Sequence, residues 1–263
     1  MPEHADLVTV SVDNAVAAVQ LNRPDRRNAL SPELDEALRT TLKSVAHRDD
    51  VRAILLHAAG STFCAGADLQ FLHPSPTPEE IQTHVLDRYA PLVRQIVDSR
   101  VPVVAALNGS TAGAGLAIAL ACDLRLMADD AVFVAGFSSI GFVPDSGVAY
   151  FLVNQLGYAR AFEMLAFSEP VPAEQCASWG LVNRVVPAEN LLEAAHTYTR
   201  RLAERPTKAL QWTKTCLRHA QTDTLDTTIE HEALYQSLAV QTRDHQEGVA
   251  AFIEKRAADF KGR

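Results

Sequence analysis

The feature that most constrains the fold is the stretch 103–123, VVAALNGSTAGAGLAIALACD, in which one apolar run leads through glycines into another. The first run, Val103–Leu107, follows a proline and precedes Asn108-Gly109, a pattern typical of a buried strand that ends in a turn. The second run, 116–120, is apolar on every side, which predicts a helix sunk in a core. A strand that meets a helix through glycines aims the free N–H groups of the helix start at whatever lies in front of them. The corner therefore predicts a site for an anion or a developing oxyanion.

Three interpretations of this corner compete. A dinucleotide-binding loop needs G-x-G-x-x-G, but Ile118 stands where the third glycine belongs. The small residues can also serve close packing alone. The third interpretation, an oxyanion hole, needs a second N–H donor from elsewhere in the chain. A second small-residue corner at 59–69 follows a strand predicted at 51–57, and the N–H of Ala67 is the candidate donor.

Composition and charge narrow the class of protein. The 263 residues suffice for one large domain, or one domain with an appendage, and the net charge of −8 argues against binding to nucleic acid or an anionic membrane. No apolar run reaches membrane-spanning length and the N-terminus lacks the pattern of a signal peptide, so we expect a cytoplasmic protein. The four cysteines form no C-x-x-C pair and the nine histidines form no H-x-x-x-H. We therefore expect neither a metal site nor a bound cofactor.

Hydrophobic periodicity predicts a β/α core over 1–195 and a helical region over 196–263. A surface loop is expected at 73–80, which holds three prolines. Strands are expected at 7–12, 15–21, 51–57, 103–107, 124–128, 131–135 and within 179–187. Helices are expected at 32–46, 79–99, 116–120, 148–156 and 159–167, and in three or four segments from 191 onward.

Six short motifs, in order over more than 230 residues, resemble the crotonase superfamily, the enoyl-CoA hydratase/isomerase group. They are Asn22-Arg23-Pro24 with Asn28-Ala29-Leu30, Phe63-Cys64-Ala65-Gly66-Ala67-Asp68-Leu69, Asn108-Gly109 through Gly115 with Cys122-Asp123, Gly141-x-x-Pro144, Ala177-x-x-Gly180-Leu181-Val182, and Phe252-x-x-Lys255-Arg256. The resemblance implies an α/β fold, a crotonase-type spiral of β-β-α turns with a C-terminal helical region for trimerisation. It also implies an acyl-CoA thioester as substrate, and a homotrimer or a hexamer made of two trimers.

The resemblance also implies the parts of the site. The N–H groups of Ala67 and Ala114 would hold the thioester oxygen while an enolate forms, and Ala114 keeps the N–H although the family commonly has glycine there. The substrate, with the coenzyme A that is part of it, would contact residues from several segments, and the last two of these residues can belong to a neighbouring subunit. They are Arg26, Arg27, Ala29, Ala65, Asp68, Leu69, Gly113, Phe137, Phe142, Pro144, Phe252 and Lys255. For each of these side chains alone, a solvated surface position is the competing interpretation.

The chemistry follows from a departure from the family pattern. Typical hydratases carry two glutamates that activate water, and here those positions hold Ala117 and Phe137. One acid remains in the loop, Asp145, directly after Pro144. A single carboxylate can take a proton from one carbon of an enolate-stabilised thioester and return it to another. Phe137 and Phe142, with the neighbouring valine, would desolvate Asp145 and raise its pKa, which makes it a better base.

We therefore predict an enoyl-CoA isomerase with Asp145 as proton shuttle, and several alternatives stay open. Asp145 can instead cap the following helix. A hydratase with a non-standard acid, a ring-epoxide phenylacetyl-CoA isomerase and a catalytically inactive acyl-CoA binder remain possible. A 4-chlorobenzoyl-CoA dehalogenase would use the Asp as a nucleophile with a Trp and a His, but the loop has Phe137 and the nearest candidate, His73, lies in the expected surface loop. A serine hydrolase fails, because Pro144 breaks G-x-S-x-G around Ser146.

Overall fold

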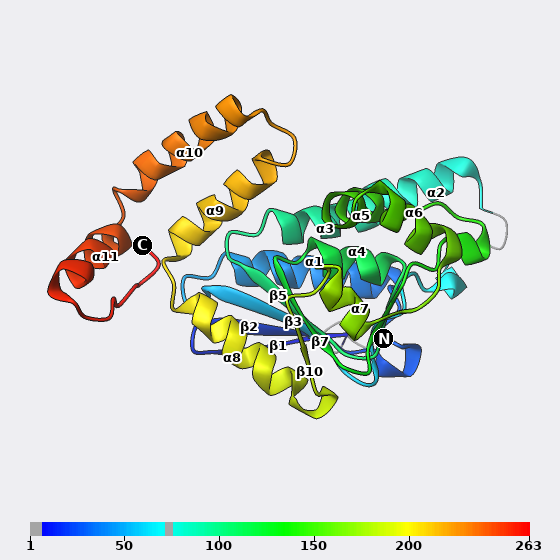
Figure 1. Ribbon diagram of the computed structural model, residues 1–263. Helices are drawn as coiled ribbons and strands as arrows, with labels where there is room; N and C mark the ends of the chain where they lie inside the picture. The colour runs from blue at the N-terminus through cyan, green and yellow to red at the C-terminus, as the bar shows by residue number, and fades with distance from the viewer. Residues whose placement is uncertain (1–6, 72–75) are drawn as a thin grey trace.

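The computed structural model describes residues 7–71 and 76–263, and its core is a spiral in which strands of two sheets alternate with helices (Figure 1). The larger sheet has the strand order β1-β2-β3-β5-β7-β10. Its strands are β1 Val8–Asp13, β2 Val16–Leu21, β3 Ala53–Ala58, β5 Val103–Leu107, β7 Leu124–Ala128 and β10 Arg184–Val186. β1 pairs with β2 in the antiparallel sense and the other neighbours pair in parallel. The central strands β3 and β5 lie among the most deeply buried segments, as their continuous apolar runs predict.

A second, smaller sheet has the order β4-β6-β8-β9. Its strands are β4 Thr62–Cys64, β6 Ser110–Ala112, β8 Val132–Val134 and β9 Val171–Pro172. Each of β3, β5 and β7 passes into a strand of this sheet before the chain turns into helix, which confirms the expected β-β-α spiral. β4 and β6 were not predicted as strands and lie within the two predicted corners, because three residues beside glycine are too few to show the alternation of a strand.

Helices cover both sheets (Figure 1): α1 Pro32–Ala46, α2 Pro78–His84, α3 Ala90–Val97, α4 Ala114–Ala121, α5 Val148–Leu156, α6 Tyr158–Phe167, α7 Ala173–Ser178 and α8 Leu191–Ala203. α1 begins as predicted, with Pro32 in its first turn and the Ser31 hydroxyl accepting from the N–H of Leu34 at 3.2 Å. All eight residues of α4 are buried, which confirms the helix sunk in the core. Within the described parts of the chain, no helix is long and apolar enough to cross a membrane.

The predicted helix 79–99 exists in three parts, because a π-helical turn, Val85–Tyr89, joins α2 to α3. Of the loop expected at 73–80, residues 73–75 with His73 lie outside the described residues. The predicted end of this loop at residue 80 is wrong, because Thr77 is already the N-cap of α2. The Thr77 hydroxyl accepts from the N–H of Glu80 at 3.2 Å, and the Glu80 carboxylate accepts from the N–H of Thr77 at 2.8 Å.

The C-terminal helices α9 Thr207–His219, α10 Leu225–Ala239 and α11 Arg243–Glu254 form an arm that extends from the core in Figure 1. The predicted division after residue 195 falls inside α8, which contacts β3 and β5. The arm is tied to the core by Lys214, whose ammonium lies 2.8 Å from the Asp123 carboxylate and 2.9 Å from the carbonyl of Ile96. The division into two regions therefore stays a prediction.

Asp35, on the buried side of α1, is expected to limit stability at neutral pH. The residue is 3% exposed, its Oδ1 has no hydrogen-bond partner among the residues described, and burial raises its pKa from 3.8 to about 6, against the opposing charges of Arg39 and Arg88. Between those two values the folded chain holds a proton that the unfolded chain releases, so the free energy of unfolding falls as pH rises from about 4 to about 6. Above that window the charged carboxylate costs on the order of 3 kcal/mol at most.

Asp35→Asn is therefore expected to raise the thermal midpoint at pH 7.5 by about 5 °C, with a smaller gain at pH 4.5. Thermal denaturation followed by circular dichroism at both pH values measures this. Asp49→Asn, which neutralises an exposed aspartate shortly after α1, is the matched control. An equal gain at the two pH values would contradict the explanation by charge burial.

Candidate active site

The two small-residue corners lie side by side in the structure. β4 and β6 pair in parallel, with Thr62 opposite Ser110, so the corners that follow them leave the same edge of the small sheet. Gly66 has φ +93°, and a Cβ there would lie 2.9 Å from the carbonyl oxygen of Ala112 and 3.4 Å from the nitrogen of Ala114. A Cβ on Gly113 would lie 3.7 Å from the Cα of Gly66. The corners approach this closely because glycine provides the backbone at both.

Both candidate donors are free of other hydrogen bonds. In the described parts of the chain, neither the Ala67 N–H nor the Ala114 N–H donates to a protein acceptor, although the neighbouring N–H groups of Asp68 and Gly113 do. On one side, the Leu30 N–H donates to Gly66 and the Asp68 N–H donates to Leu30, which leaves the intervening amide unpaired. Ala114 is the first residue of α4, and no side chain caps this helix. Two unpaired amides at one place are what an oxyanion hole requires.

Both amides border a pocket with a volume of about 340 Å³. Its wall comes from the two corners, from the helix that contains the π turn, and from the loop before α5. The lining residues are Ala65, Gly66, Ala67, Leu69, Ile81, His84, Val85, Tyr89, Ala112, Gly113, Ala114, Gly136, Phe137, Ile140, Phe142, Val143 and Asp145. The wall is mostly apolar with a few polar groups, which is the usual character of a site for an organic ligand.

Asp145 is the one carboxylate in this described lining, and it does not cap α5. The N-cap position belongs to Gly147 at φ +87°, and no side chain donates to or accepts from that helix end. Instead Asp145 accepts a hydrogen bond of 2.7 Å from the hydroxyl of Ser146, which is itself held at φ +54°. Burial raises the pKa of Asp145, while the Ser146 hydroxyl and His84 pull it part of the way back. The carboxylate is therefore free to act in the pocket, as a stronger base than an ordinary aspartate.

The residues that shield Asp145 from water differ in part from those predicted. Phe137 is buried as expected, but Phe142 is 42% exposed and Val143 is 78% exposed. The buried side of the pocket includes Tyr89, which sequence analysis did not identify. A signal for it exists in the sequence, because Ile81, Val85 and Tyr89 recur at helical spacing and all three line the pocket.

His84 is the second residue that sequence analysis missed. Its Nε2 is buried without a hydrogen-bond partner among the described residues, and its ring packs edge-on against Tyr89 with centroids 4.7 Å apart. Burial and the charge of Arg88 lower the pKa of His84, so its imidazole is neutral near pH 7 although Asp145 opposes the shift. Burial raises the pKa of Tyr89, which keeps the phenol protonated. The pocket thus holds one carboxylate beside neutral polar groups.

Some predicted coenzyme A residues lie outside this pocket. Asp68 is buried and forms an ion pair of 2.6 Å with Arg23, so its carboxylate already has a partner. Ala29 is buried and its carbonyl accepts from the same guanidinium at 3.0 Å. Arg26 and Arg27 are exposed beside the corner at 59–69, since the N–H of Ala65 donates to the Arg27 carbonyl at 3.0 Å.

Three other predicted residues, Pro144, Phe252 and Lys255, do not line the pocket. Pro144 lies directly before Asp145 in the chain. Phe252 and Lys255 lie at the end of α11, which Figure 1 places at the opposite end of the molecule from α2 and its pocket residues. Within one chain, the fold does not bring them to the site.

Comparisons with known proteins assign the family of this chain. The protein family described as enoyl-CoA hydratase/isomerase matches residues 11–263. The chain belongs to that family. The resemblance to the crotonase superfamily is thereby confirmed, and so is the expectation of an enzyme.

Individual members of the enoyl-CoA hydratase/isomerase family match over almost the whole chain. A 1,2-epoxyphenylacetyl-CoA isomerase from Escherichia coli (strain K12) is 38% identical over 98% of this chain and 99% of its own length. A 4-chlorobenzoyl coenzyme A dehalogenase from Arthrobacter sp is 31% identical over 94% of this chain and 91% of its own. The crystal structure of an enoyl-CoA hydratase from Polaromonas sp. JS666 superposes with a TM-score of 0.91 at 31% identity, covering 96% of this chain and 99% of that one. The fold and the family are therefore established over the same residues.

In this chain, the two positions that the family resemblance assigns to water-activating glutamates hold no carboxylate. Ala117 is fully buried inside α4 and does not line the pocket. Phe137 forms part of the apolar wall. An acyl-CoA bound here would meet Asp145 as the only carboxylate of the described lining.

Proposed function

We propose that this enzyme is an acyl-CoA isomerase in which Asp145 moves a proton between two carbons of the bound thioester. One observation carries the proposal: the same pocket contains one desolvated carboxylate, which does not serve as a helix cap, and two unpaired backbone amides. Hydration in this family uses a pair of glutamates, and this chain has neither of the two carboxylates. Isomerisation needs only one base that works in both directions.

In the proposed reaction the N–H groups of Ala67 and Ala114 bind the thioester oxygen of a 3-enoyl-CoA. Asp145 removes a proton from the α-carbon, and the electron pair of that C–H bond moves into a dienolate whose negative oxygen the two amides stabilise. The protonated carboxyl then returns the proton to the γ-carbon, which gives the 2-enoyl-CoA and restores the carboxylate. No water is consumed. The proton on the Asp145 carboxyl exchanges with solvent in a fraction of the turnovers, so heavy water labels the α- or γ-carbon of the thioester.

A second candidate substrate is a ring 1,2-epoxide of an arylacetyl-CoA. The isomerase from Escherichia coli that carries this substrate in its name is 38% identical to this chain. Three aromatic side chains, Tyr89, Phe137 and Phe142, line the pocket and suit a planar or nearly planar ring. The same two amides and the same carboxylate would serve this reaction.

Mass spectrometry and NMR of the products made in heavy water test the proposal. A 3-enoyl-CoA, a 2-enoyl-CoA and a ring-1,2-epoxyphenylacetyl-CoA are each incubated with the full chain. Isomerisation without gain of water, with deuterium at the α- or γ-carbon of an enoyl substrate, supports the proposal. Rearrangement of the epoxide at unchanged mass would favour the second candidate substrate. Gain of one water by the enoyl substrates would overturn the proposal in favour of a hydratase. Chloride release from 4-chlorobenzoyl-CoA would favour a dehalogenase. That reaction uses a histidine, and His84 lines the pocket.

Ser146→Ala is expected to move the acid limb of the pH profile of kcat/KM to higher pH. The Ser146 hydroxyl lowers the pKa of Asp145, so its removal raises that pKa further, and the base then loses its charge at a higher pH. The profile is measured on the preferred isomerisation substrate. Ser146→Gly, which removes the hydroxyl and relieves the left-handed backbone, should show the same displacement. An unchanged limb in both variants would contradict the proposed coupling.

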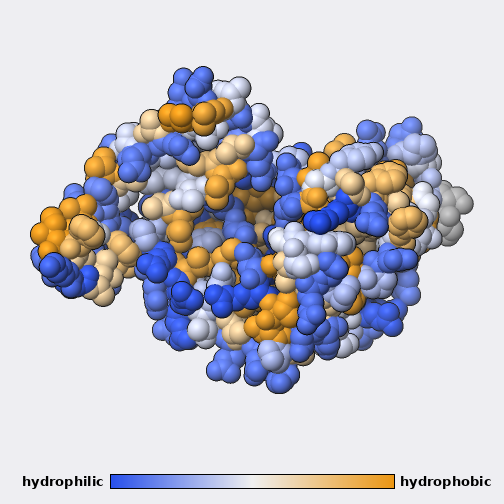
Figure 2. All heavy atoms as spheres, in the orientation of Figure 1, coloured by the Kyte–Doolittle hydropathy of each residue, from blue (hydrophilic) through white to orange (hydrophobic). Residues whose placement is uncertain are grey.

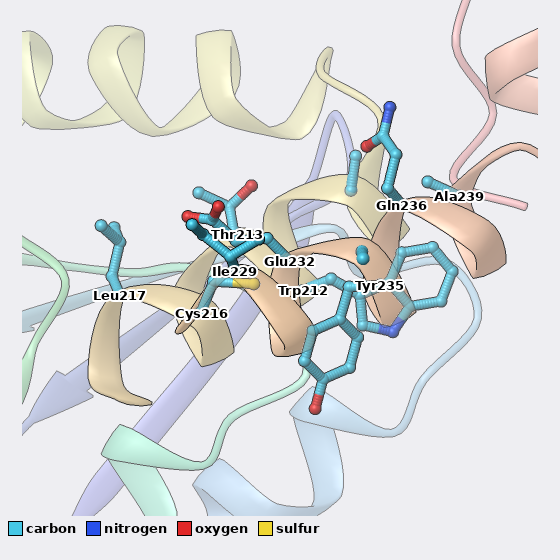
Figure 3. A pocket seen from close by; sticks show the side chains of 11 residues that line it. Trp212, Thr213, Cys216, Leu217, Ile229, Glu232, Tyr235, Gln236 and Ala239 are labelled. Carbon is cyan, nitrogen blue, oxygen red and sulfur yellow. The ribbon is translucent and has the colours of Figure 1, made fainter. Parts of the chain in front are cut away.

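We also propose a homotrimer, or a hexamer of two trimers, as the working assembly in the cytoplasm. Exposed apolar side chains gather at the tip of the α9–α10 hairpin and over α11 (Figure 2), where Phe252 is 85% exposed. Between α9 and α10 lies a hollow of about 590 Å³, bordered by the stacked rings of Trp212 and Tyr235 (Figure 3). An exposed apolar surface of this extent is typical of an interface. The assembly would let Phe252 and Lys255 meet the coenzyme A of a neighbouring subunit, with Arg26 and Arg27 beside its phosphates.

A further inference from the structure

We propose that His219, Asp223 and His231 form a binding site for a divalent transition metal, of which Zn²⁺ fits best. His219 ends α9, Asp223 lies in the turn that follows, and His231 lies in the second turn of α10. One ligand atom from each residue lies within 4.8 Å of the other two. None of the three lines the pocket of Asp145, so this site is separate from the proposed isomerase chemistry.

Two of the three distances between ligand atoms fit a small tetrahedral ion, and the third, between the two histidines, is within 4.8 Å. The Nδ1 atoms of His219 and His231 lie 3.5 Å and 3.1 Å from the same oxygen, Oδ2 of Asp223. Zinc bonds of about 2.0–2.1 Å at tetrahedral angles hold neighbouring ligand atoms about 3.3–3.4 Å apart. The two nitrogen–oxygen distances of 3.1 Å and 3.5 Å lie on either side of that value. Two imidazoles and one carboxylate would fill three positions and leave the fourth to water.

Burial supplies a second, independent reason for a cation. The Asp223 Oδ2 and His231 Nδ1 atoms are buried, and neither has a hydrogen-bond partner in the part of the chain that the structure describes. They lie at ion-pair distance without the geometry of a hydrogen bond. Buried polar atoms without partners are rare in folded proteins, because each one loses its water without compensation. One ion between these atoms and His219 would satisfy both.

Such an ion would join the end of α9 to α10 across the turn 220–224. The same turn contacts the core, since the hydroxyl of Tyr150 in α5 donates to the side-chain oxygen of Gln221. α5 begins three residues after Asp145. The metal would therefore stiffen the hairpin of the arm at the place where it meets the helix that follows the active-site loop.

The test is a titration of the full chain with Zn²⁺ alone, after chelator treatment and dialysis, in competition with a chromophoric chelator. We expect one Zn²⁺ per chain. Co²⁺ in its place should give the visible absorption bands of a four-coordinate ion. Saturation at 100 times the Kd should raise the thermal midpoint by about 5 °C.

Variants assign the binding to these three residues. Asp223→Asn, which keeps the shape of the side chain, and His231→Gln should each weaken Zn²⁺ binding by at least about 10-fold. His47→Gln removes an exposed histidine at the end of α1 and should change nothing. Circular dichroism confirms that each variant is folded. No binding to the wild-type chain, or the same Kd in the wild-type chain and both ligand variants, would overturn the proposal, and activity of the isomerase site is not needed for either result.

Discussion

Asp145→Asn is expected to lower kcat for isomerisation by about 10²- to 10⁴-fold and to leave the Kd of the acyl-CoA nearly unchanged. The amide has the shape of the carboxylate and can still accept the hydrogen bond from Ser146, so the pocket keeps its form. It cannot accept a proton from carbon near neutral pH. The loss should therefore appear in the proton-transfer step alone, and rates of product formation together with equilibrium binding of the substrate measure the two parts separately.

The control for this variant is Asp25→Asn, which neutralises an exposed aspartate in the turn after β2. It should turn over like the wild-type chain. Deuterium exchange at the α-carbon in heavy water gives a further readout, since it needs only removal of the proton and not its return. If Asp145→Asn keeps both exchange and turnover, Asp145 is not the base and the proposed mechanism fails.

Ala114→Pro is expected to lower kcat by about 10²- to 10³-fold, because it removes one of the two N–H donors. The substitution suits this position structurally. Ala114 is the first residue of α4, where a proline ring is tolerated because the N–H has no partner within the helix. The negative charge on the thioester oxygen develops only as the enolate forms. The effect should therefore fall on kcat more than on the Kd of the substrate.

Ala114→Gly is the matched control, since it keeps the N–H and removes only a methyl group. Its kcat should stay close to that of the wild-type chain. Steady-state kinetics of both variants on the preferred substrate, with thermal midpoints to confirm the fold, measure the contribution of the donor. Equal kcat values for Ala114→Pro and Ala114→Gly would show that this amide takes no part in the reaction.

The sequence by itself determined the architecture and the location of the proposed oxyanion corner. The run Val103–Leu107 and the helix α4 are continuously apolar, and an element buried on all sides leaves that mark in its own residues. The glycines at 113 and 115 identified the corner because a backbone that approaches another chain segment closely excludes a Cβ, as the contact of Gly115 with Cys64 shows. The motif Gly141-x-x-Pro144 identified Asp145, which follows it directly. The family motifs also showed that Ala117 and Phe137 stand where the usual pair of glutamates would be.

Only the tertiary structure decided which residues distant in sequence meet. His84 and Tyr89 reach the pocket because the helix with the π turn lies over the corner at 113, a contact that no local period encodes. Asp68, predicted to contact the ligand, instead pairs with Arg23, 45 residues away. His231 meets His219 and Asp223 only after the chain has turned from α9 into α10. Local patterns report whether a residue is buried, but the partner that it meets depends on the packing of elements that the sequence separates.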